Sequence, residues 1–246
     1  MFGFLVYIFN ILLYKPLFNL LVFLYNFLPW PDFGLAIILL TVVIRIILYP
    51  VSARALKSQM AMQKIQPLLQ DIQKKYKNDK EKQAKETLEL YKKEKINPFG
   101  GLLLALIQLP ILIALYSVFW NGLRAGELNN LYSFISNPGQ INPIFFGAIN
   151  LSKSNLIFAF LAGIFQFFQT KMLLPKTPKS RPDAKDISQI MQTQMVYIFP
   201  IVTVIILFRL PSALGLYWIV SSLFSIIQQY FFLKKSKKMD VGRPVA

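Results

Sequence analysis

The chain alternates between long apolar runs and polar connections, and this pattern predicts its main elements. A helix needs about 20 mainly apolar residues to cross the roughly 30 Å hydrocarbon core of a bilayer. Five runs approach or exceed this length, so we predict an all-α membrane protein with five transmembrane helices. The predicted spans together form one core, 34–233, and cover residues 34–50, 102–120, 155–174, 195–210 and 213–233.

Residues 1–30 are also apolar, but Lys15-Pro16 divides them into two pieces. At about 13 and 12 residues, each piece is too short to cross a bilayer. The polar side chains of this stretch fall largely on one side of a helix: Asn10, Lys15, Asn19 and Asn26. We therefore predict an N-terminal interfacial amphipathic helix lying in the membrane plane. A kinked extra span is the alternative.

A charged connection follows the first span, and residues 51–99 hold 12 Lys/Arg against 6 Asp/Glu. Within it, residues 57–95 are predicted to form a helical hairpin with a narrow apolar seam, turning at Lys77-Asn78-Asp79-Lys80. Pro67 is expected to kink or delay the first helix. The seam positions recur at three- and four-residue spacing: Met62, Ile65, Leu69, Ile72 and Tyr76, then Ala84, Leu88 and Tyr91. The alternative is a charged link between two spans.

Composition agrees with a membrane protein and narrows its chemistry. Apolar residues make up 55% of the 246 residues, and the mean hydropathy is +0.48. The chain has no cysteine and no histidine, which removes disulfides, thiolate metal sites and the commonest general base. We therefore predict no enzyme activity, no catalytic residue, no cofactor and no metal site.

The net charge of +16 implies anionic partners such as lipid head groups, ribosomal nucleic acid or acidic polypeptides. The basic tail 234–246 is predicted to contact the ribosome or anionic lipid. Connections rich in Lys/Arg face the cytoplasm, so their distribution predicts an N-terminus outside and a C-terminus in the cytoplasm. The counts are 12 in 51–99, 2 in 121–154, 5 in 171–194 and 5 in 234–246.

The predicted span 34–50 carries one charged residue, Arg45. A charge in a span costs about 2.5 kcal/mol or more, so an intramembrane arginine is by default functional and faces protein or water. The alternative is snorkelling, because Arg45 lies only roughly 7 Å from the Pro50 end of the span. No Asp or Glu occurs in any predicted span. The natural partner of Arg45 is therefore water or an acidic group from another molecule.

Four glutamines are predicted at a depth similar to that of Arg45, about 6 to 12 Å from the cytoplasmic ends of their spans. They are Gln108, Gln166, Gln169 and Gln228. If they share a face with Arg45, they predict a wet indentation that opens to the cytoplasm. Each glutamine alone is better explained as an interhelical hydrogen-bond donor or as an interfacial residue. Trp218, in the outer half of the last span, fits an aromatic belt or a wall of the indentation.

The order of these motifs resembles the YidC/Oxa/Alb family of membrane protein insertases, from about residue 15 to residue 233. The motifs are GLAIILLTVVIRIILYP with its arginine, KIQP in the hairpin, NPFGG followed by LIQLPILIALY, AGIFQFFQTK, and FPI followed by LYWIVSSLFSIIQQ. The resemblance implies a five-helix bundle around a hydrophilic groove that opens to the cytoplasm and the inner leaflet. Three places depart from the family pattern, at Gly101-Leu102-Leu103-Leu104, Ala213 and Ser222.

The resemblance also implies a client-binding groove. By position, the family's groove arginine corresponds to Arg45, its third-span glutamine to Gln169 and its last-span aromatic contact to Trp218. Thr41, one turn before Arg45, falls at a client-contact position. Gln108 completes the predicted set.

The family implies a membrane protein insertase and chaperone that acts without covalent chemistry, alone or with the Sec translocon. Its clients are membrane proteins with short translocated segments. It also implies a bacterial cell membrane and a compact form without a large extracytoplasmic domain. A small transporter or channel is the alternative, although cation coupling usually needs an intramembrane acid or histidine. A passive ribosome tether would explain the basic tail but not the buried polar residues.

Overall fold

The computed structural model describes residues 2–97, 100–122, 124, 126–173 and 187–241. The described chain is mostly helical, as predicted, with one two-stranded antiparallel pair that the sequence pattern did not predict. Its elements are α1 (Phe2–Phe9), η1 (Asn10–Tyr14), α2 (Lys15–Phe27), α3 (Phe33–Ile47), α4 (Tyr49–Lys64), α5 (Gln66–Lys75), α6 (Lys80–Lys93), α7 (Gly100–Asn121), η2 (Glu127–Asn130), β1 (Ile144–Phe145), β2 (Ile149–Asn150), α8 (Leu156–Met172), α9 (Ile187–Leu207) and α10 (Ser212–Val241).

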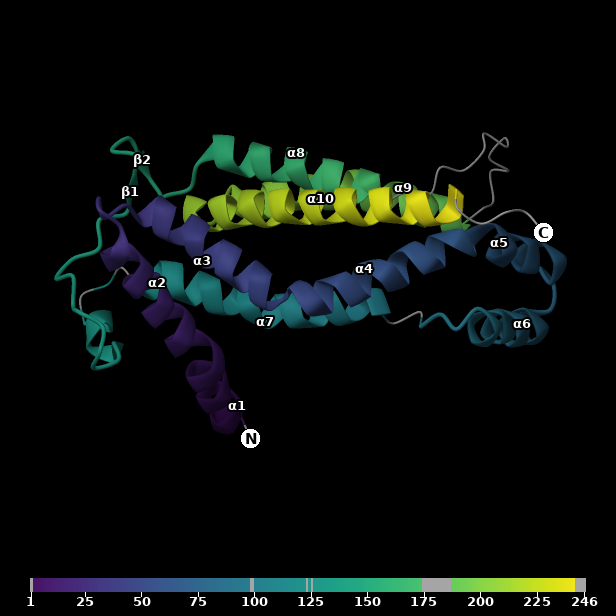
Figure 1. The fold of residues 1–246 in the computed structure, drawn as a ribbon, viewed down its shortest axis with the longest axis horizontal. Coiled ribbons are helices and arrows are strands. Elements are labelled where there is room, and N and C mark those ends of the chain that lie inside the picture. Colours follow the sequence, from purple (N-terminus) through teal and green to yellow (C-terminus); the bar gives the residue numbers. More distant parts are fainter. Residues whose placement is uncertain (1, 98–99, 123, 125, 174–186, 242–246) are drawn as a thin grey trace.

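The long helices form an elongated bundle (Figure 1). Helix α10 packs against α8, α3 and α7, while α9 lies against α8 and α4 against α7. The α7–α8 connection with β1 and β2 lies at one end, here called the loop end, and α5 and α6 lie at the other, here called the hairpin end (Figure 1). The arrangement therefore has two chemically different ends joined by common helices.

The described helices are those of a membrane-type protein. By length and composition, Gly3–Phe27 and Ser212–Lys234 can each cross a membrane, and α3 with α4 makes a third candidate if the bent pair is one span. Three shorter apolar helices cover Leu106–Asn121, Leu156–Met172 and Val196–Leu207. The five-span arrangement stays a prediction. Helix α10 also continues through Val241, so the predicted basic tail begins inside a helix.

The N-terminal stretch is one continuous helix, so the predicted division at Lys15-Pro16 is wrong. A π-helical turn, η1, precedes the proline, and the Lys15 N–H donates to the Asn10 carbonyl. This wider turn lets the chain pass Pro16, which has no N–H to donate and would clash in a regular helix interior. Figure 1 shows α1 leaving the bundle obliquely. Its described side chains are largely exposed and apolar, with Phe4 and Tyr7 among them.

Helices α3 and α4 meet at an elbow. The two axes are bent by 64° at Leu48, and Pro50 lies in the first turn of α4, where its missing N–H costs little. At the other end of α3, the Asp32 carboxylate accepts from the Leu35 N–H at 2.9 Å and from the Phe146 N–H at 2.7 Å. Asp32 therefore caps α3 and ties it to the loop end.

The hairpin contains the two predicted helices, α5 and α6, which pack against each other. The expected break occurs near Pro67, because α4 ends at Lys64 and α5 begins at Gln66. Ile65 and Leu69 are buried as the seam predicts. Leu88, however, is exposed, so the seam predicted on α6 is wrong. A polar contact joins α6 to the end of α5, where the Tyr76 hydroxyl donates to Glu86 at 3.5 Å.

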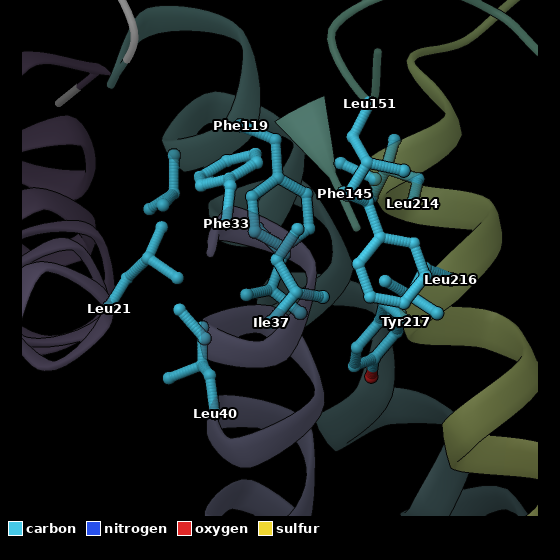
Figure 2. Close-up of a cluster of buried hydrophobic side chains, with 14 of the residues drawn as sticks. Leu21, Phe33, Ile37, Leu40, Phe119, Phe145, Leu151, Leu214, Leu216 and Tyr217 are labelled. Carbon is cyan, nitrogen blue, oxygen red and sulfur yellow. The ribbon is translucent and has the colours of Figure 1, made fainter. Parts of the chain in front are cut away.

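The apolar core is concentrated near the loop end (Figure 2). Phe33 and Phe119 meet edge to face with ring centroids 6.2 Å apart. The Phe145 ring lies against Gly34, where an added Cβ would overlap the ring. Side chains from α2, α3, α7, β1 and α10 therefore fill this end of the bundle closely, as the labels in Figure 2 show: Leu21, Phe33, Ile37, Leu40, Phe119, Phe145, Leu151, Leu214, Leu216 and Tyr217.

Candidate functional site: a polar ladder beside a buried arginine

Arg45 lies in the last turn of α3, three residues before the elbow. The C-terminal end of a helix carries partial negative charge, which favours a cation there. The side chain is half-buried, and its Nε atom is buried without a hydrogen-bond partner among the described residues. The Tyr217 hydroxyl is near enough for an electrostatic interaction with the guanidinium. Arg45 thus retains an unsatisfied donor, which a water or an incoming acceptor can reach only if the side chains around it move.

A stripe of buried polar side chains runs along α10, the helix that packs on α3. Its members follow each other at spacings of four, four and three residues, which places them on one face of the helix. We call this stripe the polar ladder: Tyr217, Ser221, Ser225 and Gln228. The Ser221 hydroxyl, like Arg45 Nε, has no partner among the described residues. The ladder therefore offers hydrogen-bonding groups without charge.

The two ends of the polar ladder bind different helices. At one end, Gln108 of α7 donates to the Tyr217 hydroxyl. At the other end, the Gln228 amide donates to the Ser52 hydroxyl of α4 at 3.0 Å. The ladder thus spans 11 residues of α10 between these contacts, a distance of about 16 Å along the helix. It links α7 to α4 through α10.

One predicted site residue, Trp218, meets one of the four glutamines, Gln166, on the neighbouring face of α10. The Trp218 indole N–H donates to the Gln166 side-chain oxygen at 2.8 Å, and Gln166 is buried. Gln169, the glutamine singled out by resemblance, is half-buried one turn further along α8. The glutamine that meets the tryptophan is therefore Gln166, and a client-binding role of Gln169 stays a prediction.

Thr41 lies in the interior of the bundle. It is 0% exposed, and its hydroxyl donates to the Ile37 carbonyl one turn earlier in the same helix at 2.6 Å. Its hydroxyl is therefore satisfied within α3. Contact between Thr41 and a client would require the helices around it to separate.

The predicted single layer of glutamines is not what the structure shows. Gln108 and Gln166 bind residues in the first two turns of α10, near the loop end, whereas Gln228 lies at the contact with α4. The polar groups follow the length of α10 instead of sharing one depth. Counting residues from helix ends missed this because neighbouring helices are shifted and tilted relative to each other.

Four residues of this site were not predicted from the sequence: Ser52, Tyr217, Ser221 and Ser225. A signal for the last three was present, since hydroxyl-bearing residues at four-residue spacing in an apolar helix mark one face. Within the described part of the chain, no three Cys, His, Asp or Glu side chains gather as a metal site would require. The arrangement can solvate a polar segment and attract an anionic one.

Comparisons with known proteins agree on one family. The family model described as "60Kd inner membrane protein" matches residues 23–239. The membrane protein insertase YidC of Fusobacterium nucleatum subsp. nucleatum is 37% identical over 206 residues, covering 83% of this chain and 87% of that protein. The YidC of Oceanobacillus iheyensis is 35% identical over 202 residues, covering 80% and 72%.

One solved structure is similar as well. It is the crystal structure of an active YidC insertase with the first transmembrane domain resolved, with a TM-score of 0.59 and 28% sequence identity. The match covers 89% of this chain and 46% of that chain. The YidC of Endomicrobium trichonymphae is likewise matched over 90% of this chain but 39% of its own length. Longer relatives thus contain sequence outside the shared region.

Proposed function

This chain belongs to the 60Kd inner membrane protein family, that of the YidC membrane protein insertases, and we propose that it inserts client membrane proteins through a hydrophilic groove beside Arg45. The observation that carries this proposal is the buried, unpartnered Nε of Arg45 next to the polar ladder of α10. No covalent chemistry is required.

The physical task is to move a polar segment across hydrocarbon. Such a segment loses its hydrogen bonds with water, at a cost of about 1–3 kcal/mol for each polar group left unsatisfied. Hydroxyl and amide groups along α10 replace part of that hydration. Burial of the client's apolar span in lipid then drives release, contributing about 25 cal/mol per Å². The groove residues in this proposal are Arg45, Gln108, Gln169 and Trp218, together with Thr41, which a client contacts only when the helices around it separate.

Arg45 supplies the attraction for acidic translocated segments. A guanidinium in low-dielectric surroundings acts over a longer range than one in water. Among the described residues of the bundle helices α3, α7, α8 and α9, no Asp or Glu competes for it. A client carboxylate would therefore be its first strong partner.

The proposal includes an orientation in the cell membrane. The hairpin end and α10's basic end face the cytoplasm, and the loop end faces outward, following the Lys/Arg distribution. The chain has no cysteine, so single cysteines can be introduced without background. With an impermeant maleimide, Gln73→Cys should react only from the cytoplasmic side and Ser136→Cys only from outside, since both residues are exposed. Reaction of Gln73→Cys from outside would overturn this orientation.

Two partners are proposed with the groove. The basic end of the chain, residues 234–246, binds ribosomal RNA phosphates or anionic lipid through weak contacts that salt screens. The Sec translocon receives some clients jointly with this protein. In both cases the groove remains the place of insertion, so a chain ending at Phe232 should still insert a released client in purified liposomes.

The test of the groove is client insertion into proteoliposomes that contain only this protein. Arg45→Ala should lower insertion of a client with an acidic translocated tail about tenfold, while a neutral-tailed version loses far less. Arg45→Lys should retain much of the activity if charge suffices. Arg209→Ala is the matched control, because Arg209 is exposed at the loop end. Equal losses for both tails would refute the electrostatic role, and no loss for either would refute the role of Arg45.

A further inference from the structure

A second polar site lies at the loop end, apart from Arg45 and the polar ladder. It is a pocket of about 380 Å³ between the N-terminal helix, the end of α7 and η2. This volume is near the lower limit of ordinary small-ligand sites, which span about 300–1,000 Å³. Most of its lining residues are of polar type, and they come from three separate parts of the chain: Asn10, Ile11, Tyr14, Lys15, Ser117, Asn121, Glu127 and Asn130.

The pocket is built on fixed groups. Glu127 is held by the Tyr14 hydroxyl at 2.9 Å and by the Asn130 amide at 3.0 Å, both of which donate to its Oε2. Asn19 lies beneath, almost fully buried, and donates to the carbonyls of Lys15 and Asn130. The N-terminal helix and η2 are therefore locked together around the pocket.

Two opposite charges line this pocket without pairing with each other. Lys15 lies over the Tyr132 ring at 5.3 Å, and no carboxylate among the described residues is within ion-pair distance of its ammonium. Glu127 uses Oε2 for Tyr14 and Asn130, while Oε1 accepts from no described residue. A cation and an anion held apart in one pocket complement a ligand that carries both charges.

The π-helical turn η1 supplies part of this lining, including Asn10 and Tyr14. Such turns are rare and occur frequently at functional sites. Here the turn accommodates Pro16, so that the helix continues past it. The same turn presents polar side chains beside Lys15. The pocket therefore depends on the same local irregularity that keeps the N-terminal helix continuous.

The surroundings of the pocket combine interface-type aromatic residues with apolar side chains, which favours a position at the boundary between lipid and water. Trp120, next to Asn121 of the lining, is exposed and stacks on Tyr116, as aromatic residues at membrane interfaces do. Ile11 and Leu12 on the other side are exposed and apolar. A ligand with a zwitterionic head and apolar tails would place its tails along these side chains.

We propose that this pocket binds the head group of an amine-bearing zwitterionic phospholipid, with the phosphate at Lys15 and the ammonium at Glu127. Phosphatidylethanolamine has this chemistry. Its ammonium can donate to the free Glu127 Oε1, whereas the neutral glycerol head of phosphatidylglycerol cannot pair with a carboxylate in this way. Bound lipid would fasten the N-terminal helix to the loop end.

The test is native mass spectrometry of the purified full chain titrated with defined lipids. Phosphatidylethanolamine should bind about tenfold more tightly than phosphatidylglycerol of the same acyl chains, the factor that one charge-assisted hydrogen bond provides. Glu127→Gln keeps an acceptor for Tyr14 and Asn130 but removes the charge, so it should abolish this preference. Lys15→Met should weaken both lipids, and Lys153→Met, an exposed loop-end lysine outside the pocket, should change neither.

Two results would overturn the proposal. One is equal binding of the two lipids by the unmodified chain, a comparison that needs no variant to fold. The other is a preference for phosphatidylethanolamine that persists in Glu127→Gln. Soluble phosphoethanolamine, added as competitor, should displace the lipid only at far higher concentration, because it lacks the tails. Displacement at equal concentration would assign the pocket to a soluble zwitterion and refute the lipid assignment.

Discussion

The two ends of the bundle are built from the same helices but from different chemistry. Near the loop end, α10 contributes Leu214 to a core with Phe33 and Phe119, all almost fully buried. Further along the same helix, Gln228 and Gln229 are equally buried, and the Gln229 side-chain oxygen has no partner among the described residues. Burial is therefore shared by both regions, and what differs is whether the buried side chains are apolar or polar.

This difference separates stability from function along one helix. Apolar side chains that interlock lose contacts when any of them is shortened, so the loop end should carry most of the free energy of unfolding. Polar groups between helices contribute less in a membrane, about 0.6 kcal/mol for an average hydrogen bond, because alternatives exist in the unfolded state. Residues of the polar ladder can thus be substituted with only a small loss in the free energy of unfolding.

The largest expected effect is at the loop end. Phe119→Ala should lower the free energy of unfolding by about 3–5 kcal/mol, since it removes a fully buried ring and leaves a cavity beside Phe33. Denaturant unfolding of the purified protein in detergent would measure it. Phe208→Ala is the control, because Phe208 is half-exposed on the bundle surface. Similar losses for both variants would contradict a core concentrated at the loop end.

An intermediate effect is expected where the polar ladder meets α4, at the contact between Ser52 and Gln228. Ser52→Ala leaves the Gln228 amide without its acceptor, so unfolding should become easier by about 1 kcal/mol. Adding Gln228→Leu to that variant should restore most of the loss, because both polar partners are then gone. The double variant should nevertheless insert polar-tailed clients several-fold more slowly. Normal insertion by a stable double variant would show that this end of the polar ladder is only structural.

The smallest effect should come from Trp218→Phe. The ring still packs, but the hydrogen bond to Gln166 is lost, so the free energy of unfolding should fall by about 0.6 kcal/mol. Trp30→Phe is the matched control, since Trp30 is 82% exposed and should show no change. If Trp218→Phe lowered the free energy of unfolding by several kcal/mol, Trp218 would have to be counted with the loop-end core. The distinction between the apolar and polar regions of α10 would then fail.

The helices themselves were readable from hydropathy, and Arg45 from its isolation in an apolar run. α7, α8 and the first part of α10 begin within two residues of the predicted limits, since apolar length is a property of the sequence alone. The failures concern relations between helices. Choosing Gln166 over Gln169 as the partner of Trp218 requires the rotation of α8 against α10, which packing decides.

Predictions from local sequence failed at two places, the helix around Pro16 and the seam on α6. Pro16 predicts a break because a regular helix interior excludes it, yet a single π-helical turn removes the conflict. Leu88 fits a helical seam by spacing, but α5 meets a different face of α6, so this apolar side chain is left exposed. The spacing of apolar residues predicts neither the π-helical turn nor the exposure of Leu88. Each depends on which of several backbone or packing arrangements with the same apolar pattern has the lowest free energy.

The elbow at Leu48 would act as a pivot if α4 and the hairpin rotated relative to α3. Beyond it, α4 extends about 24 Å, so a rotation of about 5° there displaces the tip of α4 by about 2 Å. The displacement of a residue in α4 grows with its distance from Leu48. Ser52 lies only one turn from Leu48, so the same rotation would displace its contact with Gln228 by only a small fraction of the displacement at the tip. If a partner pushed on the hairpin, the displacement at Ser52 would therefore be much smaller than the displacement at the tip of α4.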